Sequence, residues 1–228
     1  MRLSVLALLI TFFAPIAALG HTIAGSDANY VQGIDGQAIA PFMYLGAKHM
    51  VTGYDHLLYL FAVVFLLSRP FHVLQFVSLF ALGHSITLLS GVLLNLEVNP
   101  FLIDAMIGFS IVYKALENMG GFRSPSRWHV EPKLAVFVFG LFHGLGLATK
   151  LQAFNLSPNG LIVNIISFNI GVELGQLLAL SVILLALTLW RTRAKDLQYA
   201  FTINTVLMTG GFLLTSYQLS AYFLSTSY

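Results

Sequence analysis

Six long apolar stretches occupy most of this chain and constrain its fold more than any other feature. Each is close to or above the roughly 20 residues that an α-helix needs to cross about 30 Å of hydrocarbon. Only 9% of the residues are charged and 57% are hydrophobic, whereas soluble domains have about 25% and about 45–50%. The sequence therefore excludes a soluble globular domain and predicts an all-α, polytopic membrane protein with six transmembrane helices. The stretches are residues 41–68, 71–94, 101–119, 133–153, 160–190 and 199–225.

The first 20 residues have the pattern of a secretory signal peptide. Met1 and Arg2 precede an apolar run, and the sequence Ala18-Leu19-Gly20 provides a small-x-small cleavage site. The alternative is an uncleaved first membrane helix, which Pro15 disfavours. We therefore predict a signal peptide at 1–20.

A polar, Gly-rich segment at 21–40 follows, and we expect it outside the membrane, before the six-helix domain at 41–228. After cleavage, His21 would carry a free amine beside its imidazole, which is a pair of nitrogen ligands suited to copper or nickel. An exposed terminal histidine without a metal is the simpler interpretation of the same residue.

Basic residues are distributed unevenly between the two sides of the predicted membrane domain. The connections after the first, third and fifth apolar stretches contain seven, whereas those after the second and fourth contain only Lys150. Because Lys and Arg are enriched in cytoplasmic loops, both mature termini should be periplasmic in a bacterial inner-membrane protein. The seven are Arg69, Arg123, Arg127, Lys133, Arg191, Arg193 and Lys195.

Ionisable residues inside the apolar stretches are the functional candidates. A charge at the bilayer centre costs roughly 2.5–3.5 kcal/mol on insertion scales, so such residues usually face a cavity or one another. At about 1.5 Å per residue, they form a path from the outer surface to the middle of the membrane. We predict that they are metal ligands: His49, Asp55, His56, His84, His143 and Glu173.

The first motif is His49-x5-Asp55-His56, in the first apolar stretch. In a continuous helix, seven residues at about 100° each bring His56 within about 20° of His49. Alternatively, Thr52-Gly53 breaks the helix and Asp55 caps its inner half, as in the unwound helices of transporter ion sites. The sequence leaves both geometries open, and it also leaves open a purely structural pairing of Asp55 with Lys48 or His56.

Glycines flank two of the other candidates. Gly140 and Gly144 surround His143, and Gly171 and Gly175 surround Glu173. Because such spacing lets helix backbones approach closely, we expect both candidates at packed interfaces, although the glycines could serve helix packing alone.

Two further polar residues accompany Glu173 on its helix. Asn169 and Gln176 lie at i−4 and i+3, on the same face, and are expected to support Glu173 or to add ligands. For His84, as for any single helical histidine, a hydrogen-bonded core residue is the alternative interpretation.

The available donors restrict the ligand. There is no cysteine, and imidazoles with carboxylates suit Ni²⁺, Co²⁺, Zn²⁺ or Cu²⁺ better than Ca²⁺ or Cu⁺. The scattered basic residues argue against nucleic acid, and the chain lacks a G-x4-G-K-[ST] loop for nucleotide. The expected partners are therefore a metal ion and the lipid bilayer. The sequence leaves open whether the chain forms a homo-oligomer.

Several motifs together resemble the HupE/UreJ family of bacterial membrane proteins. They are His49-x5-Asp55-His56, Gly83-His84-Ser85-Ile86-Thr87-Leu88, Phe142-His143-Gly144 and Phe168-Asn169-Ile170-Gly171-Val172-Glu173-Leu174-Gly175-Gln176. The resemblance covers nearly the whole mature chain. That family is associated with hydrogenase and urease maturation and is regarded as nickel permeases. The resemblance implies metal-handling roles for His49, Asp55, His56 and His143.

One departure from the family's motifs indicates which branch of the family the chain resembles. The better-known branch continues its Phe-His-Gly motif with a second His-Gly and a Glu, where this chain has Leu147, Ala148 and Lys150. The chain is therefore similar to the family's second branch, which has the Gly-His-Ser and Val-Glu-Leu-Gly-Gln signatures. The leading hypothesis is an inner-membrane permease for a divalent transition metal, with nickel as the leading candidate. The alternatives are an intramembrane metalloenzyme with Glu173 as general base, and a metal-binding accessory or sensor protein.

Overall fold

The computed structural model describes residues 33–67, 69–122, 130–154, 156–193 and 198–226, and in these ranges the chain is all-α. This confirms the predicted fold class. The predicted signal peptide, His21 and most of the segment 21–40 lie outside the described residues. The helices are α3 (Ile39–Thr52), α4 (Tyr54–Val64), α5 (Pro70–Leu93), α6 (Pro100–Asn118), α7 (Pro132–Gln152), α8 (Leu161–Arg193) and α9 (Gln198–Thr226).

Proline begins three of these helices. Pro70, Pro100 and Pro132 occupy first-turn positions, where the missing N–H costs nothing. Asn99 also caps α6, since its side-chain oxygen accepts hydrogen bonds from the backbone N–H groups of Phe101 and Leu102, at 3.0 and 3.3 Å.

Among the described residues, three helical segments are long and apolar enough to cross a membrane: Pro70–Leu93, Pro132–Gln152 and Leu161–Leu189. The expectation of six spans is thus supported only in part. The first expected span is interrupted, so that neither α3 nor α4 is long enough alone. Helix α6 has three charged residues, and α9 is rich in Thr, Ser and Gln.

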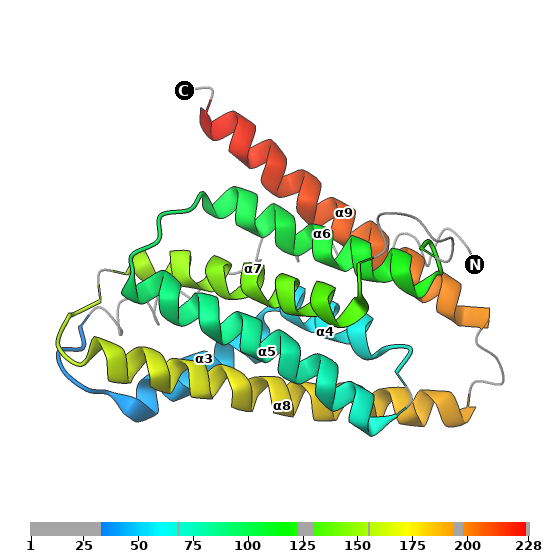
Figure 1. The fold of residues 1–228 in the computed structure, drawn as a ribbon, viewed down its shortest axis with the longest axis horizontal. Coiled ribbons are helices and arrows are strands. Elements are labelled where there is room, and N and C mark those ends of the chain that lie inside the picture. The colour runs from blue at the N-terminus through cyan, green and yellow to red at the C-terminus, as the bar shows by residue number, and fades with distance from the viewer. Residues whose placement is uncertain (1–32, 68, 123–129, 155, 194–197, 227–228) are drawn as a thin grey trace.

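Three helix pairs make the most extensive contacts: α5 with α7, α3 with α8, and α6 with α9. Figure 1 shows α8 along one side of the bundle and α9 along the opposite side, with α4, α5, α6 and α7 between them. The interior between them is an apolar core in which Tyr59, Phe65, Ile111 and Val136 are almost fully buried.

Glycines allow the α5–α7 and α3–α8 pairs to approach closely. A Cβ on Gly140 would overlap the Phe80 carbonyl, and one on Gly171 would overlap the Met43 carbonyl. Similarly, a Cβ on Gly175 would lie 2.7 Å from the Ala47 carbonyl oxygen. The small-xxx-small spacings of the sequence therefore do mark close helix packing.

Candidate metal centre

The helix that contains the first motif breaks at Gly53. This residue has φ −73° and ψ 96°, which is extended rather than helical backbone, and its N–H donates to the His49 carbonyl at 2.8 Å. Of the two geometries that the sequence allows, the broken one is therefore observed. The N-cap of α4 is Gly53, and Asp55 lies in the first turn of this helix. The Oδ1 atom of Asp55 lies 3.1 Å from Nδ1 of His56.

The space around Gly53 at the break is too tight for a side chain unless a neighbour shifts. A Cβ at this position would lie 3.0 Å from the His49 carbonyl oxygen and 3.1 Å from Nδ1 of His56. The break thus places the end of α3 and the start of α4 against each other, with the motif's histidines on both sides of it.

Four histidines from four helices meet beside this break. The ring centroid of His56 lies 5.3 Å from that of His49, 5.8 Å from that of His84 and 5.0 Å from that of His143. His56 is therefore the central member of the cluster. The least buried of the four is His49, which is 8% exposed, and His143 is 0% exposed. Five of the six predicted ligands, including Asp55, are thus brought together in the interior.

The close packing of α5 on α7 positions His84 and His143. Because Gly83, Gly140 and Gly144 lie at this contact, the two backbones can touch. The hydroxyl of Thr87 on α5 reinforces it by donating to the Leu141 carbonyl at 2.6 Å. The histidine on each helix then projects toward the space that α3 and α4 close from the other side.

The hydrogen bond of His143 fixes its tautomer. Nδ1 lies 2.8 Å from the backbone carbonyl oxygen of Phe139, and because a carbonyl can only accept, Nδ1 must carry the proton. The Nε2 lone pair is then available, and this atom is buried without a hydrogen-bond partner among the described residues. A histidine held through one nitrogen with the other nitrogen available is the usual arrangement of a metal ligand.

The spacing of the four imidazole rings fits a shared metal ion, but the orientation of the rings does not. Imidazoles bound through nitrogen at about 2.0–2.1 Å to one tetrahedral ion would have centroids about 5 Å apart. In the structure the three rings around His56 meet it edge to face, with interplanar angles of 72–79°. No group of three or more His, Asp or Glu side chains in the described ranges is arranged to hold an ion. Coordination would require the rings to rotate.

Glu173 lies apart from the buried histidines. It is exposed on the surface of the bundle, where Oε1 accepts a hydrogen bond from Ser85 Oγ at 3.3 Å. It lines a pocket of about 350 Å³ between α5 and α8, together with Ser85, Gln176 and several leucines.

Asn169 and Gln176, the other residues predicted around Glu173, connect α8 to α5. Asn169 Nδ2 donates to Ser85 Oγ at 2.9 Å, so that Ser85 links Asn169 to Glu173. Gln176 Nε2 donates to the Val77 carbonyl at 3.3 Å. Asn169 therefore contacts Glu173 only indirectly, through Ser85 on the neighbouring helix α5.

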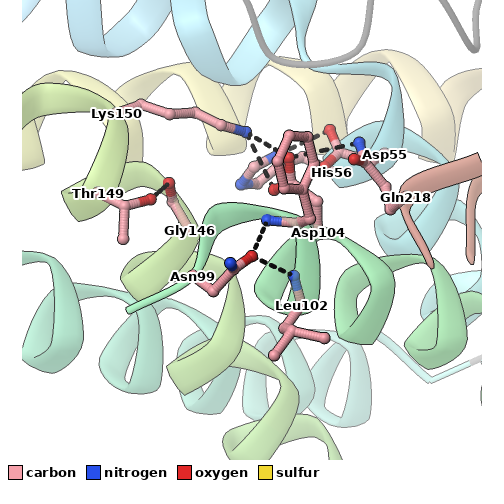
Figure 2. A network of polar contacts seen from close by, with 10 residues as sticks. Asp55, His56, Asn99, Leu102, Asp104, Gly146, Thr149, Lys150 and Gln218 are labelled. Carbon is pink, nitrogen blue, oxygen red and sulfur yellow. Dashed lines mark hydrogen bonds and ion pairs between the residues drawn. The ribbon is translucent and has the colours of Figure 1, made fainter. Parts of the chain in front are cut away.

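Sequence reasoning missed a polar network next to the histidines, which Figure 2 shows. Lys150 Nζ lies 3.0 and 3.1 Å from the two carboxylate oxygens of Asp104, and Gln218 Nε2 lies 3.4 Å from Asp104 Oδ2. Asp104 could have been found, because it is an acidic residue within a predicted span. Tyr59 was also missed; its ring lies 5.2 Å from that of His143.

The fold and the site define a class: helical membrane proteins with a buried polar centre formed from several helices. Within that class, the sequence matches the HupE / UreJ protein family over residues 25–226, and the chain belongs to this family. This confirms the resemblance that the sequence motifs indicate. No curated protein and no solved structure matches the chain significantly.

Proposed function

We propose that this protein is a permease of the bacterial inner membrane that carries a divalent transition-metal ion through its histidine cluster. Nickel is the leading candidate for this ion. The observation that carries the proposal is the burial of His49, His56, His84 and His143 around one point. Neutral imidazoles together with the Asp55 carboxylate suit such an ion. The HupE / UreJ family, generally linked to nickel or cobalt transport or to urease accessory function, supports the same metals.

The proposal includes six membrane-spanning segments, the first of which is α3 and α4 together. The relative directions of the two helices in each packed pair support this number of spans. Gly171 and Gly175 meet Met43 and Ala47 in order, so α3 and α8 run parallel. In the same way α5 and α7 run parallel, whereas α6 and α9 run antiparallel. Six helices that cross a membrane alternately, in chain order, must have these relative directions.

The charges of α6 are compatible with a span because they are paired inside the bundle. Asp104 pairs with Lys150, and Lys114 Nζ lies 3.0 Å from Glu117 Oε2. Lys114 also lies over the ring of Phe76, 5.7 Å from its centroid. With the basic connections in the cytoplasm, both termini of the mature chain are periplasmic.

Polar residues continue from the histidines toward the cytoplasmic end of α4. The Tyr59 ring lies against that of His143, with the two centroids 5.2 Å apart. Beyond it, Asn118 Nδ2 donates to the Ala62 carbonyl at 2.8 Å. A membrane potential that is negative inside would favour inward movement of a dication along this path by about 4.6 kcal/mol per 100 mV.

The test is metal uptake by the full chain in proteoliposomes with an imposed inside-negative potential. Ni²⁺, Co²⁺, Zn²⁺ and Cu²⁺ are compared side by side. We expect uptake of nickel to fall at least about tenfold in His56→Ala and in His143→Ala, because each removes a central ligand. The matched control is His72→Ala, since His72 is exposed at the start of α5 and should have no effect.

Two results would contradict the proposal. Equal uptake by the wild type, His56→Ala and His143→Ala would exclude the histidine cluster as the path. Tight metal binding by the purified wild type without any flux would instead favour the accessory or sensor function.

A further inference from the structure

The ion pair between Lys150 and Asp104 lies between the outside and the histidine cluster. Lys150 comes from the last turn of α7 and Asp104 from the first turns of α6, so both are near the predicted periplasmic ends of their helices. Their side chains are 18% and 11% exposed, whereas the side chain of His56 is 0% exposed. The pair is therefore the more accessible end of one polar region.

This pair lies next to the candidate metal centre along α7. Lys150 follows His143 by seven residues on this helix, so it lies two turns further along and within about 20° of the same face. Figure 2 shows the Lys150–Asp104–Gln218 contacts beside Asp55 and His56. A charge on either member of the pair will therefore change how strongly the centre attracts a cation.

The two charges cancel each other while Lys150 remains on Asp104. An ammonium in this position also repels a dication that approaches the histidines. If the ammonium moves away, the same position presents a carboxylate, which is a good ligand for Ni²⁺ and Co²⁺. The lysine therefore occupies a place that suits the transported ion.

The surroundings allow the lysine to move. Its side chain is long and has several rotatable bonds, and it is partly exposed. One turn earlier on α7, Gly146 has no side chain, and a Cβ there would lie 3.6 Å from Asp104 Oδ1. Asp104 thus lies in the space over Gly146 and has a second contact, with Gln218, that does not depend on the lysine.

We propose that Lys150 is an electrostatic gate: its ammonium covers Asp104, and an incoming dication displaces it and uses Asp104 as the first carboxylate ligand on the way to the histidines. This inference rests on the proposed transport function and adds to it a receiving site and a residue that controls access. Without such a role the pair would only tie α6 to α7, and the two roles predict different effects on metal affinity.

The experiment measures the Kd for Ni²⁺ of the purified full chain by calorimetry, in the wild type and in variants of the pair. Lys150→Met should tighten binding about tenfold, because it removes a like charge and leaves Asp104 available. Asp104→Asn should weaken binding about tenfold, because the lysine charge then remains near the centre without its partner. The double variant should lie between the two.

A control and a second variant keep the test decisive. Lys133→Met removes the same charge from the exposed opposite end of α7 and should leave Kd unchanged. Lys150→Arg keeps the charge and offers Asp104 a two-pronged contact, so it should weaken Ni²⁺ binding, which is the opposite direction to Lys150→Met. This comparison remains informative if Asp104→Asn fails to fold.

The gate is overturned if Lys150→Met and Lys150→Arg both leave Kd within about twofold of the wild type while the melting temperature falls. That result, with stability restored in the double variant, would show a tie between helices and nothing more. It would leave the proposed transport function intact, because the wild type would still bind and carry Ni²⁺. Absence of wild-type binding and flux would overturn both.

Discussion

The backbone carbonyl of His84 lies directly against the Cα of Gly144, at the contact between α5 and α7. A Cβ on Gly144 would overlap this carbonyl oxygen and also the Thr87 hydroxyl. Because His143 is the next residue on α7, the same contact determines how closely two candidate ligands can approach each other. Helix packing and the geometry of the candidate metal centre therefore depend on the same glycine.

Gly144→Ala is expected to destabilise the protein by about 1–3 kcal/mol, because overpacking at a tight contact forces backbone shifts. It should also weaken Ni²⁺ binding, since α5 and α7 would separate at His84 and His143. Thermal unfolding in detergent and calorimetric titration measure the two effects. The control is Leu134→Ala, at an exposed position of the same helix. Unchanged unfolding of Gly144→Ala would mean that the two backbones are not in contact.

Glycine spacing explains why the sequence predicts the place of one ligand and not of another. Gly140 and Gly144 lie at i−3 and i+1 from His143, about 60° and 100° around the helix from it, so His143 lies at the edge of the glycine face. Gly171 and Gly175 lie at i−2 and i+2 from Glu173, and two residues at about 100° each put them on the opposite side. The expectation that both candidates lie at the glycine-packed interfaces was therefore correct for His143 and wrong for Glu173.

Other features depend on contacts that one sequence does not contain. The apolar stretches predict where the helices lie. The motifs predict the buried residues His49, Asp55, His56, His84 and His143, but they also include Glu173, which is exposed. The pairing of Asp104 with Lys150, however, joins residues 46 positions apart on different helices, and no local pattern specifies it. The break at Gly53 was one of two geometries that the sequence allowed, because either one brings His49 near His56.

Gly53→Ala tests the break itself. The added methyl group would meet the His49 carbonyl and Nδ1 of His56 at 3.0 and 3.1 Å, so His56 must shift by a few tenths of an ångström. We expect the Kd for Ni²⁺ to rise several-fold, measured by calorimetry. The control is Thr52→Ala, which only removes a side-chain bond to the Lys48 carbonyl from an exposed residue. An effect of equal size in both variants would argue against a special role for Gly53.

Asn164 anchors the start of α3 to α8 and is 3% exposed. Its Oδ1 accepts from the Ala38 N–H at 2.7 Å, and its Nδ2 donates to the Gly36 carbonyl at 2.9 Å. Asn164→Ala should cost about 1–3 kcal/mol of unfolding free energy, because buried backbone groups lose their partners. Denaturant titration would detect this. The exposed Asn159→Ala should cost less, and an equal cost would contradict the prediction.

Asp35 gives the segment before α3 a pH dependence. Hydrogen bonds from Ser157 and Asn159 to its Oδ1, at 2.7 and 2.9 Å, hold the pKa of Asp35 below its ordinary value of 3.8. Since the folded pKa is the lower one, the carboxylate stabilises the fold above pH 3.8 and this contribution is lost as the pH falls through the folded pKa. The melting temperatures of wild type and Asp35→Asn should therefore differ at neutral pH and converge in acid. A difference that grows in acid would have the wrong sign.

Glu173→Gln tests whether Glu173 is a metal ligand, as the sequence predicts, or lies apart from the metal site, as its position in the structure indicates. The sequence pattern groups Glu173 with the histidines, but the side chain is exposed and hydrogen-bonded to Ser85. We therefore expect Glu173→Gln to leave the Kd for Ni²⁺ within about twofold of the wild type, whereas Asp55→Asn, next to His56, should weaken binding at least about tenfold. Calorimetry on both variants provides the comparison. Because Gln can still accept the Ser85 hydrogen bond, a loss of binding in Glu173→Gln would have to come from the missing charge. It would mean that α8 rotates to bring this carboxylate inward when the ion binds.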